Sequence, residues 1–394
     1  MEITPTTFIK QAISTAEYFG FSNLDVIKKH PSCKNCTTKL ENTASAMDRR
    51  IDNLNGLLTT GINNFCDNKL NAIEEPVLFY TIEQVPRSGE AAISFQIYNV
   101  NNSIAESILI QTTKSLSNDL GYQNHSVRIN SLGDRDSSTR FVRELSNYLR
   151  KRVNDLPESA REIMKEDTVN ALFNLLDQKH ELAYKSPNPL EYLTDQSRKH
   201  FREIIEFLDM SETSYEIDSK LMGHNNCYSE AMFAIDLLDN KTGEHIKDSP
   251  ITISGGRYNE FVHRNTKQPI PAAGAVVVLQ KQKAPTRLPR IKLSTPSVYV
   301  VQLGLGPKMR SLILIDQLKQ AGINVYQDLA SDSLSTQLRD AENKGVPYAI
   351  IIGQKEFVEG GVILRDMVAR NQEQVSFANV ITRLKRSKKV PSTN

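Results

Sequence analysis

Residues 333–366 read SLSTQLRDAENKGVPYAIIIGQKEFVEGGVILRD and carry the clearest structural pattern in the chain. The spacing of apolar side chains over 333–344 predicts an amphipathic helix, which Gly345 is suited to end. YAIIIG (348–353) is a short apolar run that predicts a buried strand, and GVILRD (361–366) predicts another strand. A helix that leads directly into a buried strand indicates part of a βαβ unit.

The same alternation continues on both sides of this stretch. VYVVQL (298–303) predicts an apolar strand, 309–321 an amphipathic helix, and INVYQD (323–328) the next strand. Further on, QVSF (374–377) predicts a last strand, and a helix runs from there into a basic tail. Because strands alternate with helices of about a dozen residues, we expect 298–394 to be an α/β domain with a mostly parallel core sheet.

The remainder of the chain predicts a second, larger domain over residues 1–282. Residues 283–297 contain three prolines and a cluster of basic residues, and we expect them to be an interdomain linker. Alternating patterns predict strands in the larger domain at 76–85, 92–100, 126–130, 230–238, 249–256 and 271–280. The segment 138–210 has helical spacing throughout, so it is interpreted as a helical insertion in a mixed α/β domain.

Composition limits the function classes that the chain can belong to. The formal net charge is +2, so affinity for nucleic acid must come from local clusters of basic residues. No apolar run approaches the roughly 20 residues that span a bilayer, and the first residues lack the pattern of a signal peptide. Four cysteines in 394 residues do not make a disulfide scaffold, so we expect a cytosolic protein with no membrane partner.

A possible metal site lies in the N-terminal region. Cys33 and Cys36 form a CxxC, and His30 and Cys66 are available as two further ligands for zinc. Their spacing matches no common zinc finger, so we favour a reduced polar loop and expect no metal.

The C-terminal domain resembles the anticodon-binding domain shared by the His/Gly/Thr/Pro group of class II aminoacyl-tRNA synthetases. The resemblance is carried by VYVVQLG (298–304), QLKQAGINVYQD (317–328) and residues 333–366. Within the last stretch, a Gly-x-x-Glu turn runs from Gly353 to Glu356 and is followed by Leu-Arg-Asp at 364–366.

Upstream, the resemblance narrows to the histidyl-tRNA synthetases. It is carried by RINSLGD (128–134), LLDQK (175–179), ISGGRYNEFV (253–262) and PIPAAGAVVVL (269–279). The resemblance implies an antiparallel class II sheet with a helical insertion, a homodimer, and tRNA or a tRNA-like RNA as partner. An active member of that family would use ATP and Mg²⁺ to join histidine to tRNA.

The residues that would grip ATP depart from the family pattern. Amino-acid activation builds negative charge on phosphoryl oxygens, so it needs fixed arginine or Mg²⁺ charges. Ile82 or Thr81 stands where the family has its motif 2 arginine, and Lys281 stands where motif 3 ends in arginine. The segment 221–236 has no arginine, although the family's histidine-specific phrase carries one. We therefore expect no confident catalytic residue, and the candidates for a vestigial substrate pocket are Arg87, Gly255, Gly256, Arg257, Tyr258 and Lys281.

Structural interpretations of the same residues remain open. Gly255 and Gly256 also suit a place where two strands approach closely. Arg257 and Tyr258 also suit a partly buried polar pair with no ligand.

Candidate RNA contacts lie in the C-terminal domain. Single-stranded bases are read by polar side chains at sheet edges, with basic residues on the phosphates. By that criterion we select Gln354, Lys355 and Glu356 in the predicted turn, Arg365 on the next strand, Arg339 on the second helix, and Arg383, Lys385 and Arg386 in the tail. The alternative for Glu356 and Arg365 is a cross-strand ion pair.

Three functional hypotheses follow from these patterns. The first is a non-catalytic relative of histidyl-tRNA synthetase that binds tRNA or a similar RNA. The second is an active but diverged histidine–tRNA ligase. The third is a regulatory or accessory subunit built on the same scaffold.

Overall fold

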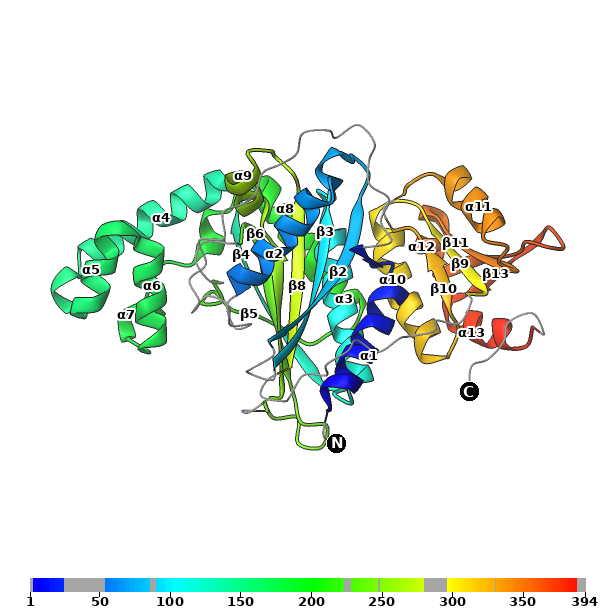
Figure 1. Ribbon diagram of the computed structural model, residues 1–394, viewed down its shortest axis with the longest axis horizontal. Coiled ribbons are helices and arrows are strands. Elements are labelled where there is room, and N and C mark those ends of the chain that lie inside the picture. Colours follow the sequence, from blue (N-terminus) through cyan, green and yellow to red (C-terminus); the bar gives the residue numbers. More distant parts are fainter. Residues whose placement is uncertain are drawn as a thin grey trace.

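The computed structural model describes residues 3–24, 54–85, 90–222, 228–246, 249–279, 296–329 and 331–387. Two sheets organise the chain (Figure 1): an eight-stranded sheet in the order β1-β2-β3-β8-β7-β6-β4-β5, and a five-stranded sheet in the order β10-β9-β11-β12-β13. This confirms the predicted fold class of an antiparallel sheet with a helical insertion, followed by an α/β module. Most of the predicted linker, up to residue 295, lies outside the described residues.

The large sheet is antiparallel except at its two ends, where β1 pairs with β2 and β4 pairs with β5 in parallel. Its strands are β1 (Ser22–Asn23), β2 (Val77–Val85), β3 (Glu90–Tyr98), β4 (His125–Gly133), β5 (Tyr215–Ile217), β6 (Glu230–Leu237), β7 (Ile251–Arg257) and β8 (Ala272–Leu279). Helices α1 (Pro5–Tyr18), α2 (Leu54–Asp67), α3 (Ile104–Asp119) and α9 (Asn259–Thr266) accompany it, with the short 3-10 helix η2 (Leu70–Ala72).

Alternation along the strands gives the large sheet two buried faces. On β3, Ile93, Phe95 and Ile97 belong to a hydrophobic cluster that includes residues of α1 and α3. Ala92 and Tyr98 belong to a second cluster on the other face, with residues of α2 and of the insertion. The two faces therefore have different neighbours, which decides what each side chain can contact.

The helical insertion begins at Arg135, three residues before the predicted start at residue 138. It begins there because Asp134 caps its first helix. The Asp134 carboxylate accepts hydrogen bonds from the Ser137 amide at 2.8 Å and from the Thr194 hydroxyl at 2.7 Å. The insertion contains α4 (Arg135–Arg150), η3 (Val153–Asp155), α5 (Glu158–Glu166), α6 (Thr168–Asp177), α7 (Glu181–Tyr184), η4 (Pro189–Tyr192) and α8 (Asp195–Met210). The preceding strand, β4, is correspondingly longer than the predicted 126–130.

The small domain has the predicted parallel core. Strand β9 pairs in parallel with β10 and β11, whereas β12 and β13 are antiparallel additions. The elements are β9 (Val298–Gln302), α10 (Leu305–Gln320), β10 (Val325–Gln327), α11 (Leu334–Asn343), β11 (Tyr348–Ile352), α12 (Gln354–Glu359), β12 (Gly361–Asp366), β13 (Asn371–Ser376) and α13 (Phe377–Lys385).

Two local predictions for this domain were wrong. Gln354–Glu356 form the first turn of helix α12 and not a loop, because Glu356 accepts a hydrogen bond from the Gly353 amide at 3.1 Å and caps the helix. Phe377 begins α13 and does not end a strand, and its strand starts earlier, at Asn371.

The two domains pack directly against each other through α1, α3 and α10 (Figure 1). The Lys319 ammonium of α10 donates to the hydroxyls of Thr15 and Ser115, each at 3.0 Å, and forms an ion pair with Asp119. The Tyr18 hydroxyl donates to the Ile323 carbonyl at 2.8 Å. Among the described helices, none is long and apolar enough to cross a membrane.

Candidate functional site

Arg257, at the end of β7, is engaged entirely inside the protein. Its side chain is 1% exposed and donates to both carboxylate oxygens of Glu106 on α3, at 2.7 and 2.8 Å. Nη1 also donates to the Val100 carbonyl oxygen at 2.8 Å, and Nη2 to the Asn102 carbonyl oxygen at 2.9 Å. A guanidinium that is satisfied in this way stabilises the core and has no free edge for a phosphate.

A histidine on α8 also contacts the Glu106 carboxylate. His200 Nε2 lies 2.9 Å from Glu106 Oε1. Burial alone would raise the pKa of Glu106, but Arg257 and then His200 outweigh it and hold that pKa well below its usual value. Burial lowers the pKa of His200, but the Glu106 carboxylate outweighs it, so the net shift is upward.

Tyr258 points to the opposite face of the sheet from Arg257, so the predicted polar pair of these two residues does not exist. The Tyr258 hydroxyl donates to Gln96 Oε1 and lies 3.4 Å from the Tyr98 hydroxyl. Both tyrosines are fully buried, not partly exposed. Consecutive strand residues point to opposite faces, which explains the separation.

Aromatic side chains fill the middle of this second face. The ring of Phe65 on α2 stacks on Tyr98 with centroids 3.9 Å apart, and Phe79 lies 5.8 Å from Tyr98 on a parallel plane. Gln96 donates to the Ser94 hydroxyl beneath them. The part of the sheet that Tyr258 reaches is therefore packed as core.

Gly255 and Gly256 are required by close strand packing. A Cβ at Gly255 would lie 2.6 Å from the Phe233 ring and 2.7 Å from the Gly274 carbonyl oxygen. A Cβ at Gly256 would lie 2.7 Å from the Ala231 carbonyl oxygen. This geometry supports the structural interpretation of the pair.

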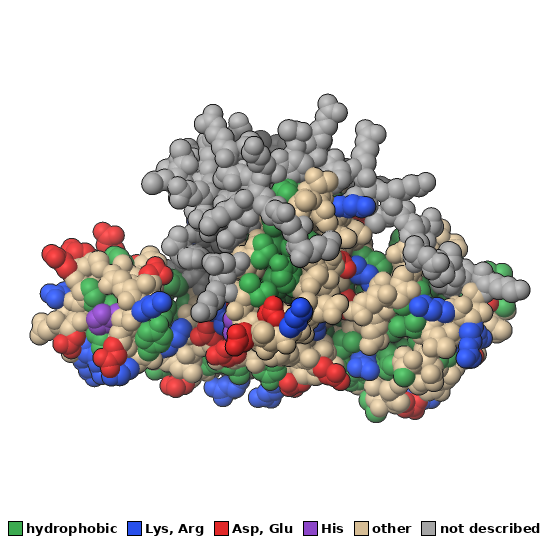
Figure 2. All heavy atoms as spheres, turned by 90° about the horizontal axis from the view of Figure 1, so that it is seen from below, with side chains coloured by type: hydrophobic (Ala, Val, Ile, Leu, Met, Phe, Trp, Pro, Cys, Tyr) green, Lys and Arg blue, Asp and Glu red, His purple; other side chains and the backbone are tan. Residues whose placement is uncertain are grey.

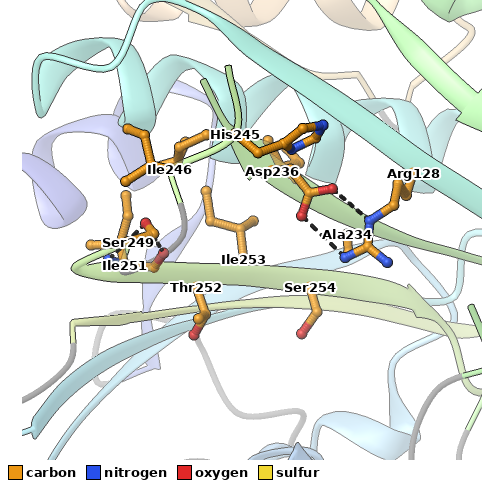
Figure 3. A pocket seen from close by; sticks show the side chains of 12 residues that line it. Arg128, Ala234, Asp236, His245, Ile246, Ser249, Ile251, Thr252, Ile253 and Ser254 are labelled. Atoms are coloured by element: carbon orange, nitrogen blue, oxygen red, sulfur yellow. Dashed lines mark hydrogen bonds and ion pairs between the residues drawn. The ribbon is translucent and has the colours of Figure 1, made fainter. Parts of the chain in front are cut away.

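A hollow of about 380 Å³ opens where β6 and β7 separate, beyond the Ile235–Ile253 pair (Figure 3). Its lining includes Thr252 and Ser254, whose side chains point to the same side, and His245. The fixed charges of its lining are already paired, as the contacts of Arg128 show.

Arg128 of β4 is held by two carboxylates. Its Nε and Nη2 donate to Asp236 at 2.5 and 3.1 Å, and its Nη1 donates to Asp218 at 3.2 Å (Figure 3 shows the Asp236 pair). Hydrogen bonding to Asp236 raises the pKa of Arg128 above its already high value. Arg128 and Arg257 are the arginines of the described strands of the large sheet, and both are neutralised.

Two predicted pocket residues cannot be placed. Arg87 and Lys281 lie outside the described residues, as do His30, Cys33 and Cys36 of the predicted metal set. Cys66 is buried within the cluster that α2 shares with the sheet. Over the described ranges no group of three or more His, Cys, Asp or Glu side chains could hold a metal ion.

A polar strip crosses two strands of the small domain. Arg365 of β12 faces Gln372 of β13, and Ile363 faces Gln374 one pair along, so all four side chains share one face of the sheet. Both glutamines are exposed, and Arg365 is half-buried. Gln372 and Gln374 were missed from the sequence, because the run NQEQ (371–374) is polar throughout and shows no alternation that would single them out.

The predicted RNA contacts lie at several places in the small domain. Arg339 is exposed on α11, whose Ala341 packs in the same cluster as Ile363, so this helix lies on the face of the sheet that also carries Arg365. Gln354 and Lys355 are exposed at the start of α12, which follows the end of β11. Arg365 pairs with Ala349 near the beginning of β11, so it lies toward the other end of that strand.

The other predicted RNA contacts have structural partners or lie elsewhere. Glu356 is 9% exposed and caps its own helix, so the alternative of a Glu356–Arg365 ion pair is wrong. Arg383 forms an ion pair with Glu373 at 2.7 Å. It shares α13 with Lys385, and Arg386 follows directly; both are exposed. Glu373 pairs with Leu364, which places α13 on the face opposite the polar strip.

The sequence of this chain is similar to those of several known proteins. Residues 298–387 match the family model described as an anticodon binding domain. A histidine–tRNA ligase from Desulforamulus reducens is 23% identical over 82% of this chain and 79% of its own length. One from Dehalococcoides mccartyi is 26% identical over 68% of this chain, and the alignment spans 63% of that relative.

Comparison with solved structures finds apo histidyl-tRNA synthetase from S. aureus among the matches. It is 14% identical, covers 82% of this chain and 80% of its own, and has a TM-score of 0.44. Histidyl-tRNA synthetase from Nostoc sp. is 17% identical, covers 98% of this chain and 97% of its own, and has a TM-score of 0.41.

Proposed function

We infer that this histidyl-tRNA synthetase-like class II protein binds tRNA through its anticodon-binding domain and does not activate histidine. The proposal that the protein does not activate histidine rests on the ion pairs of Arg128 and Arg257. Each arginine of the described strands of the large sheet is held by carboxylates of this chain.

The physical argument concerns charge in the transition state. Removal of one fixed donor from such a site costs about 3–4 kcal/mol of barrier, and several losses together nearly abolish turnover. The described residues therefore do not fit ATP with Mg²⁺, because the guanidinium groups are engaged and the aromatic packing around Tyr98 fills the middle of the face. Of the pocket residues that the sequence predicts, the cations Arg87 and Lys281 lie outside the described residues, and they are the ones that a test of activity should vary.

Binding of tRNA is supported by the match of 298–387 to the anticodon binding domain and by the polar strip. Glutamine amides can read the edges of unpaired bases, and Arg365 can contact a phosphate or stack on a base. We further propose, from the resemblance, a cytosolic homodimer.

A second candidate is an active histidine–tRNA ligase, which the names of the relatives favour. In that case ATP and Mg²⁺ would be cofactors. The accessory-subunit hypothesis predicts neither tRNA binding nor catalysis, and the same measurements separate it from both.

The deciding experiment is histidine-dependent exchange of pyrophosphate into ATP by the full chain, with tRNA binding measured in parallel. We expect tRNA binding without exchange. Exchange above background that is lost in Lys281→Ala would overturn the proposal and establish the ligase. Arg257→Ala is unsuitable for this purpose, because it leaves the buried Glu106 carboxylate without its partner and so harms folding.

A further inference from the structure

The contact between the two domains buries a carboxyl group together with its apolar side chains. Residues of α1, α3 and α10 belong to one hydrophobic cluster, and on the face shown in Figure 2 the small domain on the right continues directly from the large domain. Asp316 of α10 lies at this contact, opposite α3, and is 8% exposed. A carboxylate in such a place costs free energy unless cations or hydrogen-bond donors compensate it.

The carboxyl group of Asp316 has few hydrogen bonds. Its Oδ2 accepts one from the Gln320 amide at 2.9 Å. Its Oδ1 is buried without a hydrogen-bond partner among the described residues. Because Gln320 is on the same helix, its hydrogen bond does not depend on the contact between the domains. Docking therefore takes water away from Asp316 and gives it little in return.

The two lysines near Asp316 do not neutralise it. Lys319 forms its ion pair with Asp119, and the ammonium of Lys114 on α3 donates to the Thr213 hydroxyl at 2.6 Å. Within the described residues neither lysine forms an ion pair with Asp316. A carboxyl group in these surroundings is easier to bury in its protonated, neutral form.

The surrounding charges set the direction of the effect. Burial is the largest cause that raises the pKa of Asp316, and Asp119 adds to it. The groups that oppose this rise in pKa without cancelling it are the Ser115 hydroxyl, Lys319 and Lys114. From α1, Tyr18 also faces the carboxyl group, and burial and then Asp316 raise the pKa of the Tyr18 hydroxyl, so it stays neutral.

We propose that Asp316 makes the docking of the small domain onto the large domain depend on pH, with tighter docking when its carboxyl group is protonated. The contribution of Asp316 to docking is fully present below its ordinary pKa of about 3.9 and is lost as pH rises through the raised value. Above that value the docked arrangement holds a buried, poorly compensated carboxylate, which separation of the domains would return to water. This inference is independent of the proposed tRNA binding.

Calorimetry and small-angle scattering of the full chain between about pH 4 and pH 8 test this. Asp316→Asn keeps the size of the side chain and cannot ionise. It should raise the unfolding temperature at about pH 8 by about 2–4 °C or more, and this difference from the wild type should shrink toward about pH 4. The radius of gyration should grow with pH in the wild type and stay constant in the variant.

Two further variants serve as controls. Glu342→Gln removes an exposed carboxyl group from α11, and its difference from the wild type should be the same at every pH. Gln320→Ala removes the hydrogen bond to Oδ2 but keeps the Asp316 carboxyl group, so both quantities should still change with pH.

Two results would overturn the proposal. If Asp316→Asn and the wild type differed by the same amount at every pH, the carboxyl group would have a structural role only. If the radius of gyration of the wild type did not change with pH, the effect of Asp316 would lie in the folding of the domains and not in their docking.

Discussion

Arg257 and Glu106 form a bidentate ion pair in which each side chain is 1% exposed, and the pair joins the end of β7 to α3. Neither charge can be removed alone without leaving the other uncompensated in a medium that solvates it poorly. Arg257, one of the predicted pocket residues, therefore has a structural role in this pair. Its retention says little about catalysis.

Loss of either partner should cost stability. Arg257→Ala and Glu106→Gln should each lower the free energy of unfolding by about 3–5 kcal/mol, since each breaks a buried ion pair. Urea denaturation followed by circular dichroism measures this. Lys165→Ala, which breaks the exposed Lys165–Glu162 pair, should cost no more than about 1 kcal/mol. Equal losses in the buried and exposed variants would contradict the structural role.

The same cluster should make stability depend on pH through His200. Its folded pKa is raised by Glu106, so its contribution is fully present below its ordinary pKa of about 6.5 and is lost as pH rises through the folded value. Glu106 stays ionised in this range because its own pKa is lowered. Arg257 and Glu230 also act on His200, in opposite senses.

His200→Gln tests this dependence. The difference in unfolding free energy between wild type and variant should be larger at about pH 5.5 than at about pH 8.5. If the difference in unfolding free energy instead grew as pH rises, the proposed pairing of His200 with Glu106 would be wrong.

Because the aromatic side chains on the second face pack as core, truncating one of them should destabilise the fold and should not create an active site. Phe65→Ala should lower the free energy of unfolding by about 3–5 kcal/mol, and Phe65→Leu should lose less, because it refills part of the volume. Chemical denaturation of the two variants gives the comparison. If Phe65→Ala instead gained histidine-dependent pyrophosphate exchange, the aromatic cluster would be a plug and not core.

Local pattern predicted the small domain well because each of its elements is specified by neighbouring residues. The apolar runs within 348–353 and 361–366 predicted their strands with no distant information. Glu356 was predicted in a turn because the family resemblance has a Gly-x-x-Glu turn at this place. Its spacing from Gly353 is also that of a helix-capping pair, and this local signal would have predicted the helix.

The site residues were harder because their partners are distant in sequence. Arg257 meets Glu106 across 151 positions, and no periodicity in either segment indicates that contact. The opposite directions of Arg257 and Tyr258, in contrast, follow from strand alternation and could have been predicted. A distant pair such as Arg257–Glu106 is fixed by how α3 packs on the sheet, which the sequence of either segment does not show.

The contact between the domains should depend on the Lys319–Asp119 pair. Lys319→Glu should lower the unfolding free energy by about 1–3 kcal/mol, because it places two carboxylates together at a partly buried contact. The swap Lys319→Glu/Asp119→Lys should recover part of that loss, and a double-mutant cycle measures the coupling. Zero coupling energy would show that the ion pair does not hold the domains together.

The polar strip predicts how tRNA binding should respond to substitution. Arg365→Ala should weaken binding of the anticodon stem–loop and reduce the dependence of log Kd on log salt concentration by about 0.7, the effect of one lost contact to single-stranded phosphate. Gln372→Ala should weaken binding with little change in the salt dependence, because an amide releases no counterion. Arg383→Ala is the matched control: it removes an arginine from the opposite face, where Glu373 already pairs with it. Anisotropy titrations at several salt concentrations separate these cases. If Arg383→Ala weakened binding more than Arg365→Ala, the RNA would lie on the α13 face, and the strip formed by Arg365 and Gln372 would not be the binding surface.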